Sequence, residues 1–468
     1  MPGVQAAWAG PMRDEHLKHG PWFLAHTDGS TLFRVVNHTL DNGHFKVVGP
    51  TRTGKSTLAN EMVASWPKYQ GAQVSWWDVD GSARLLTHLL GGQWHHICAD
   101  GIGYQPYSDI DDPVELGWAF AWTLKLLKLA NIPLTEVVQR FVSSSLRRLA
   151  MRQRRERTMT GLLLVMVERN PQEEIMRPKQ SALQEAMERE RTAVRNALKE
   201  YTAEGPHGNL FDACEDHLGH AWLRTYEQTT LRRRGRLIEP VTSLLFHREE
   251  RTFDTRHPLL MLMDDAAVTW AISTDGSLGS TSVQAASGMI RSNSFQDNSK
   301  QWMVTTAKKY VSMGFFTHSL TQVFESPLGA LLIESCPATF ALPNPAARTP
   351  KMAAVYAQMG FNPAEIGIIS SLRPQRDIYY ANELTGKRAF SLQLSPLLLA
   401  MFARNRQEDH DLMDTILAEH GPEHFATHWL TAQGFPDAAA SLMEESGYAT
   451  STLVDRECDR PPQFHAAD

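Results

Sequence analysis

The sequence predicts an α/β fold in which a mostly parallel sheet, flanked by helices, is interrupted by an inserted all-α domain. Three observations support this prediction. Residues 49–56 match the GxxxxGK[ST] phosphate-loop (P-loop) motif and lie between a short apolar run and a helical pattern. Other short apolar runs, typical of buried strands, occur on both sides of this motif. Residues 113–240 instead show helical periodicity with few strand signals.

The amino-terminal elements follow the order strand, loop and helix. Residues 21–48 carry short β-like pieces, and the last of them, 45–48, reads as a buried strand that enters the glycine turn. Residues 57–64 read as the opening of a helix. This is the local context that a phosphate-binding loop requires, so it favours nucleotide binding over a chance glycine loop.

Each residue of the motif has an expected role. Backbone amides of residues 51–55 would surround the β- and γ-phosphates, helped by the positive end of the following helix, while Gly49 and Gly54 permit the tight backbone. Lys55 would reach the terminal phosphates and the Ser56 hydroxyl would hold Mg²⁺, so the predicted cofactors are ATP and Mg²⁺. The predicted nucleotide-binding residues are Gly49, Pro50, Thr51, Arg52, Thr53, Gly54, Lys55, Ser56 and Thr57.

The second chemical motif is the apolar run 259–263, which ends in Asp264-Asp265. A buried strand that delivers an acid pair at its carboxyl end is typical of a Walker B element. Asp264 would orient the water shell of the metal, and Asp265 would polarise the attacking water. A buried strand that stops at a solvated acidic turn is the alternative. Further strands are expected at 72–78, 314–316, 339–342, 377–380 and 389–392, and the tail after about residue 405 reads as helical.

Composition limits the classes of function. A chain of 468 residues with 42% apolar and 21% charged residues is an ordinary globular protein with room for two or three domains. The net charge of −6 does not favour nucleic acid as a partner, although a local basic patch is compatible with it. The arginine clusters within 147–157 and 232–236 lack interleaved aromatic residues, which favours solvated or subunit-contacting faces over a groove that follows phosphates.

Cysteine usage and hydropathy point to the cytoplasm. The four cysteines are far apart with no C-x-x-C pair, which favours reduced thiols over a zinc site or a disulfide framework. Every apolar run is far shorter than a bilayer span, and the amino terminus lacks a signal-peptide pattern. Any association with a membrane is therefore expected to come through partner proteins.

Several segments together resemble the TrbE/CagE/VirB-type conjugal-transfer ATPases of type IV secretion systems, from about residue 20 to 435. The matching segments are Pro21-Trp22-Phe23, Asp41-Asn42-Gly43-His44, Gly91-Gly92, Glu334-Ser335-Cys336-Pro337, Leu342-Pro343-Asn344-Pro345 and Arg376-Asp377-Ile378-Tyr379-Tyr380. The resemblance implies a RecA-like motor core with an all-α insertion that assembles as a hexamer or dimer. It also implies partners among the inner-membrane components of a secretion channel, a peripheral place on the cytoplasmic side, and a chain that is only the carboxyl-terminal motor half.

The chain departs from the family pattern at three places. Asp265 stands where the family has glutamate, and His318 stands where a glutamine would contact the γ-phosphate and its water. Residues 77–82 lack the lysine and arginine of the family signature. The shorter Asp265 predicts slow hydrolysis, and the charge of His318 would vary with pH. The changes at 77–82 bear on coupling more than on nucleotide binding. The resemblance also makes Arg376 the candidate cation that a neighbouring subunit delivers to the transition state, with a surface arginine paired with Asp377 as the alternative.

The predicted organisation has five regions. They are a disordered or partly ordered segment 1–20, a first motor-core region 21–112, the all-α insertion 113–240, a second motor-core region 241–402 and a helical tail 403–468. The predicted function is an ATP-hydrolysing motor subunit. A nucleotide-binding scaffold with weak or lost hydrolysis, and a DNA-translocating ATPase of the FtsK/HerA or coupling-protein kind, remain as alternatives.

Overall fold

The computed structural model describes residues 9–29, 31–98, 102–168, 181–216, 218–219, 221–264, 303, 306, 309–321 and 327–443. Within these ranges, one sheet of eleven strands has the order β2-β1-β11-β10-β9-β3-β8-β7-β4-β6-β5. The strands are β1 (Phe23–His26), β2 (Leu32–Val35), β3 (Phe45–Val48), β4 (Gln73–Asp78), β5 (Gln93–His96), β6 (Leu223–Glu227), β7 (Leu259–Met263), β8 (Val311–Thr317), β9 (Ala338–Ala341), β10 (Asp377–Asn382) and β11 (Gly386–Ser391).

The sheet has a parallel side and an antiparallel side. All neighbouring strands from β9 to β5 are parallel, whereas β9, β10, β11, β1 and β2 pair antiparallel in turn. The carboxyl ends of parallel strands lie at one edge of a sheet, where α/β proteins bind their ligands. β3, β7 and β8 are buried along their whole length, and their side chains are mostly apolar, with Lys46 in β3 and Ser312 and Thr317 in β8 as the polar exceptions.

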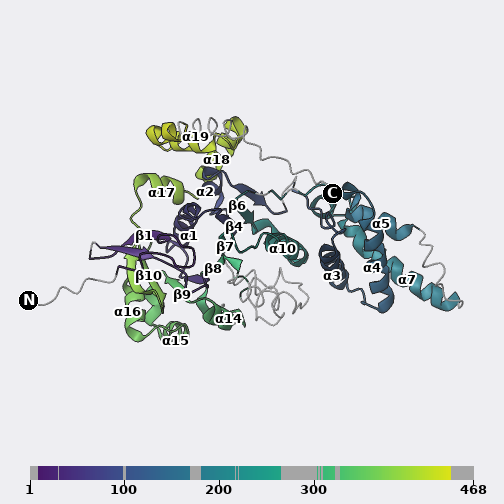
Figure 1. The fold of residues 1–468 in the computed structure, drawn as a ribbon, viewed down its shortest axis with the longest axis horizontal. Coiled ribbons are helices and arrows are strands. Elements are labelled where there is room, and N and C mark those ends of the chain that lie inside the picture. Colours follow the sequence, from purple (N-terminus) through teal and green to yellow (C-terminus); the bar gives the residue numbers. More distant parts are fainter. Residues whose placement is uncertain are drawn as a thin grey trace, which may run out of the picture.

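Helices cover both faces of the parallel side (Figure 1). Alternate side chains of β7 enter two different cores: Leu260 and Leu262 pack with α1, and Met261 and Met263 pack with α10. The helices of this body are α1 (Lys55–Ala64), α2 (Arg84–Leu89), α9 (Thr229–Arg232), α10 (Gly235–Glu250), α14 (Pro327–Ser335), α15 (Pro350–Gln358), α16 (Pro363–Ser371) and α17 (Pro396–Phe402).

A helical lobe projects from the sheet body on the right of Figure 1. Polar caps fix where its helices begin: the Asp112 carboxylate accepts bonds from Val114 N and Glu115 N at the start of α3, and Thr135 caps α4. Its elements are α3 (Pro113–Leu129), α4 (Glu136–Ala150), α5 (Met159–Val167), α7 (Ser181–Leu198) and α8 (Gly208–Phe211).

The predicted all-α insertion needs one correction, because β6 lies inside the range 113–240 and belongs to the main sheet. Its sequence contains Arg224 and Glu227, which hide the strand from a hydrophobicity pattern. Arg224 is buried because its guanidinium makes two bonds of 2.9 Å to the Glu249 carboxylate on α10, and Tyr226 donates a third bond of 2.6 Å to the same group. The chain therefore re-enters the sheet before residue 240.

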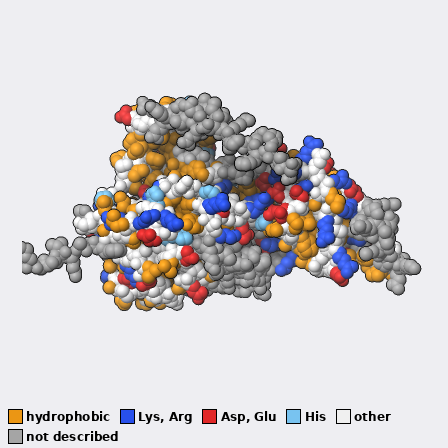
Figure 2. Space-filling view, viewed as in Figure 1, with side chains coloured by type: hydrophobic (Ala, Val, Ile, Leu, Met, Phe, Trp, Pro, Cys, Tyr) orange, Lys and Arg blue, Asp and Glu red, His pale blue; other side chains and the backbone are white. Residues whose placement is uncertain are grey.

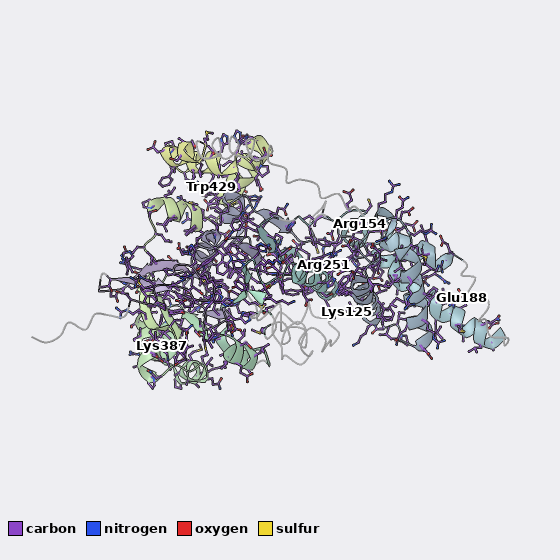
Figure 3. The ribbon with its side chains drawn as sticks, in the orientation of Figure 1. Lys125, Arg154, Glu188, Arg251, Lys387 and Trp429 are labelled. Atoms are coloured by element: carbon purple, nitrogen blue, oxygen red, sulfur yellow. The ribbon has the colours of Figure 1, made fainter. Side chains whose placement is uncertain are left out.

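The described part of the tail, up to residue 443, contains two helices and packs on the sheet body. Its helices are α18 (Gln407–His420) and α19 (Phe425–Ala432), drawn at the top of Figure 1. Met413 and Trp429 share a buried cluster with Leu85 of α2, and the Trp429 indole donates to Ala400 O of α17 at 3.1 Å (Figure 3). Hydrophobic side chains gather on the visible surface near this region (Figure 2). In the described ranges, no helix combines the length and apolarity that a membrane span needs.

Candidate functional site

The loop between β3 and α1 has the tight backbone that its glycines were predicted to allow. Gly54, which precedes the first residue of α1, has φ +110°, and Arg52 has φ +63°. A side chain at Gly49 would bring its Cβ to 2.7 Å from the Leu342 Cβ, because Leu342 N bonds Val48 O at 2.8 Å beside the loop. Close packing at Gly49 and a left-handed backbone at Gly54 therefore both require glycine.

Lys55 lies at the centre of this loop. Its ammonium group donates to Gly49 O at 2.9 Å and to Pro50 O at 2.8 Å, and the Thr53 hydroxyl donates to Pro50 O at 2.7 Å. Ser56 is exposed in the first turn of α1, and no side chain caps that helix. The positive end of α1, the loop amides and an ammonium group thus converge, which is the chemistry that binds a polyphosphate.

Asp264 comes directly after β7 at the same edge of the sheet. Its amide donates to Trp77 O at 2.8 Å, which ties it to the end of β4. Because β8 lies between β3 and β7, and strands are spaced by about 4.8 Å, Asp264 is roughly 10 Å from the P-loop strand. This separation suits a carboxylate that acts on the water shell of Mg²⁺ held by Ser56. Asp265 lies outside the described residues, so its role stays a prediction.

His318 occupies the position between these two strands. It is an exposed residue that follows the end of β8, and the carbonyl of the preceding Thr317 accepts a bond of 3.3 Å from Gly49 N. Its chain position therefore lies beside the first residue of the P-loop. The sensor role of His318 stays a prediction.

Arg376 reaches the same edge from the antiparallel side of the sheet. Since β10 is antiparallel to β9, and β9 is parallel to β3, the start of β10 lies at the carboxyl ends of the parallel strands. The Asp377 carboxylate accepts bonds of 2.7 and 2.8 Å from Arg373, and the charge of Arg376 also acts on it. Burial raises the pKa of Asp377, but the bonds and charge of Arg373 outweigh it and leave this pKa lowered.

Two buried carboxylates that the sequence did not single out as site residues shape the neighbouring loop. Asp78 accepts bonds from Ser82 Oγ at 2.6 Å and Ala83 N at 2.9 Å, and Glu227 accepts from Gly81 N at 2.9 Å. Burial, followed by the charges of Glu227 and Asp264, raises the pKa of Asp78 well above its ordinary value. The two groups hold the 79–83 turn where the family lysine and arginine are missing.

The metal chemistry fits this arrangement. Among the residues that the structure describes, no three His, Cys, Asp or Glu side chains form a direct metal cage. A Mg²⁺ ion with one hydroxyl ligand, one carboxylate in its water shell and phosphate oxygens needs no such cage. Ser56 and Asp264 are the residues that would hold it.

Arginines of the first cluster form ion pairs with carboxylates of the same chain. Arg148 and Arg152 pair with Glu168, and Arg154 pairs with Asp109 at 2.8 Å, where the helical lobe meets the sheet body (Figure 3). Figure 2 shows basic and acidic side chains interspersed over the lobe. These pairs favour a structural role for the cluster over a groove that follows phosphates.

Sequence reasoning missed two residues that contact the P-loop from afar, Leu342 and Gln375. Gln375 N donates to Thr53 O at 3.1 Å, and its side-chain amide donates to Arg52 O at 3.3 Å. The dipeptide Pro374-Gln375 carried a weak signal, because proline at the second position of a turn favours a third residue with positive φ. Nothing local indicated which loop the turn would meet.

The fold and the loop together define a class: the chain has a RecA-like P-loop NTPase fold. The structure of VirB4 from Thermoanaerobacter pseudethanolicus matches it with a TM-score of 0.56 at 15% identity, covering 80% of this chain and 97% of that one. This likeness confirms the predicted fold class.

Sequence comparison then narrows the class. The chain is 28% identical over 429 residues to a probable conjugal transfer protein TrbE of Sinorhizobium fredii (strain NBRC 101917 / NGR234), covering 90% of this chain and 58% of that protein. It is also 28% identical over 427 residues to the conjugal transfer protein TrbE of Rhizobium radiobacter, covering 89% and 46%. The predicted resemblance to TrbE is confirmed, although the chain spans only about half the length of these relatives. No family model matches the sequence.

Proposed function

We propose that this chain is an ATP-binding and ATP-hydrolysing motor subunit that energises conjugative transfer or type IV secretion. One observation carries the proposal: the Lys55 loop and Asp264 meet at one edge of the sheet, in a chain similar over nine tenths of its length to TrbE. The geometry supports the proposed nucleotide site, and the similarity to TrbE supports the proposed process.

The residues divide the work of phosphoryl transfer. Loop amides and Lys55 would bind the β- and γ-phosphates, and Ser56 and Asp264 would hold Mg²⁺, Asp264 through the water shell; the ion would neutralise charge on the phosphate oxygens. Asp265 and His318 orient the attacking water. The shorter Asp265 side chain and the titratable His318 both predict slow turnover.

The assembly and location follow from the same resemblance. The chain acts as a hexamer or dimer at the cytoplasmic side of the inner membrane and is attached there through components of the secretion channel. Native mass measurement with and without Mg-ATP tests this assembly, because a nucleotide that binds the associated state more tightly shifts the equilibrium toward it. A mass that stays monomeric under both conditions would contradict it.

Steady-state phosphate release measured beside nucleotide affinity tests the motor proposal. The wild type should release phosphate, Lys55→Ala should fall to background, and Lys128→Ala on the exposed surface of α3 should behave as wild type. Calorimetry with Mg-ATP that yields no heat from folded protein would refute nucleotide binding. Nucleotide binding without phosphate release above the Lys55→Ala background would favour the scaffold alternative. The departures at Asp265 and His318 are the reason to consider that alternative.

Duplex DNA added to the same assay tests the translocase alternative. Turnover that rises with DNA and falls steeply with salt would favour a DNA-pumping function. The internal ion pairs of Arg148, Arg152 and Arg154 instead lead us to expect no stimulation.

A further inference from the structure

The turn 373–376 lies directly on the P-loop of its own chain. Gln375 makes two hydrogen bonds to that loop, from its amide to Thr53 O and from its side chain to Arg52 O. A Cβ at Gly54 would stand 3.4 Å from the Gln375 Cα, so the two backbones are in van der Waals contact. More than 300 residues of sequence separate the turn from the loop, so this contact belongs to the tertiary fold.

The turn is built to hold that position. Arg376 N donates to Arg373 O at 3.3 Å across the turn, with Pro374 at its second position. Gln375 has φ +61°, a left-handed conformation that is unfavourable for a non-glycine residue because its Cβ crowds the following carbonyl oxygen. The two bonds to the P-loop offset this cost. Arg373 also clamps the turn, because its guanidinium binds both Asp377 and Asp28.

The backbone of Arg376, an exposed residue, is thereby held close to the nucleotide loop of its own chain. Arg376 follows Gln375 directly, so its Cα is about 3.8 Å from the Cα of Gln375, a residue that contacts the P-loop. The Asp377 carboxylate takes its hydrogen bonds from Arg373, and Arg376 adds only a weaker electrostatic attraction to the same carboxylate. A guanidinium at this place can bind phosphate oxygens through two parallel N–H donors.

We infer that Arg376 serves the nucleotide bound to its own subunit, in cis, rather than a nucleotide held by a neighbour. The inference rests on the proposed ATPase function and assigns the subunit on which this arginine acts. It also makes the turn 373–376 a positioning element, because Gln375 binds the P-loop and so fixes where the backbone of Arg376 lies relative to that loop.

A mixing experiment separates the two arrangements. Lys55→Ala subunits have a disabled loop and an intact Arg376, and Arg376→Ala subunits have the reverse. If Arg376 acts in trans, a mixture of the two regains phosphate release, because an intact loop then meets an intact arginine across an interface. In cis, no subunit holds both groups, so the mixture should stay at the level of its parents. Co-purification of differently tagged subunits verifies that the mixture forms shared assemblies.

A binding measurement provides a second, independent readout. At protein concentrations where native mass shows monomers, Arg376→Ala and Arg376→Gln should weaken the Kd for a fluorescent ATP analogue about tenfold or more, since a bond to a charged group is lost. Arg404→Ala, at an exposed position after α17, is the matched control and should leave the Kd unchanged.

The outcomes keep this inference distinct from the motor proposal. Activity regained on mixing, or a monomer Kd that Arg376→Ala leaves unchanged, would overturn action in cis while the motor proposal stands. Wild-type protein that binds nucleotide without releasing phosphate would instead overturn the motor proposal. The Kd measurement would still decide whether Arg376 contacts its own subunit's nucleotide.

Discussion

Replacing His44 should change how the stability of this fold depends on pH. His44 lies directly before the P-loop strand β3 and is fully buried. Met313 N of β8 donates to its Nδ1 at 3.1 Å, which makes Nε2 the protonated nitrogen, and Nε2 donates to Met303 O at 3.0 Å. Burial lowers the pKa of His44 from 6.5 to about 4, partly opposed by the bond to Met303. The neutral ring therefore holds the P-loop strand against the strand that leads to His318.

The lowered pKa of His44 determines the sign and the size of the change in folding stability with pH. A histidine whose pKa is lower in the folded state binds protons preferentially when the chain is unfolded, so acid favours unfolding. The stability from neutral His44 is complete above pH 6.5 and is lost as the pH falls to about 4. With these two values, the folded state should lose about 2 kcal/mol between pH 7 and pH 5, and about 3 kcal/mol in total.

Urea unfolding at pH 7 and pH 5, followed by tryptophan fluorescence, measures this loss. His44→Gln should be less stable at pH 7 but should lose about 2 kcal/mol less than wild type on acidification. His88 and His95, whose pKa values burial also lowers to about 4, contribute equally to both proteins and cancel in the comparison. His424→Gln, at an exposed position, should keep the wild-type decrease. The same decrease in His44→Gln as in wild type would refute this reasoning.

Three further changes test the site and its support. Gly49→Ala places a Cβ 2.7 Å from the Leu342 Cβ and should weaken nucleotide affinity more than tenfold. Gly117→Ala, in open space on α3, should instead raise the free energy of unfolding by about 1 kcal/mol in urea. Glu249→Ala leaves Arg224 buried without its carboxylate and should cost about 3–5 kcal/mol; a loss below 1 kcal/mol in the same assay would contradict a desolvated pair. Asp265→Glu should raise kcat, and an equal or lower kcat with nucleotide binding intact would reject the shorter side chain as the limit on turnover.

Local sequence patterns were enough to predict an element where one physical requirement determines its residues. The run 259–263 is apolar throughout, and 45–48 is apolar except for Lys46, because both faces of a central parallel strand are covered, so the strands could be predicted. The phosphate loop could be predicted because its glycines, lysine and serine act within eight consecutive residues.

Local sequence patterns did not predict a strand or a contact where that feature depends on residues far away in the sequence. β6 contains Arg224, and its burial depends on Glu249, which lies on a later helix. Gln375 gives no local sign of binding the P-loop, since its partners Arg52 and Thr53 come from the other end of the sequence. Such contacts are set by tertiary packing, which single-sequence patterns do not carry.

The strand order explains why these segments meet. β8 lies between β3 and β7, so the ends of three parallel strands bring the P-loop, His318 and Asp264 to adjacent places on one edge. After β9 the chain leaves this edge through α15 and α16, two helices that pack together, and returns to it before β10 begins. A single crossover helix would have delivered β10 parallel and placed its start at the opposite edge. The antiparallel pairing of β9 and β10 is therefore the topological reason that the turn carrying Gln375 and Arg376 reaches the P-loop of its own chain.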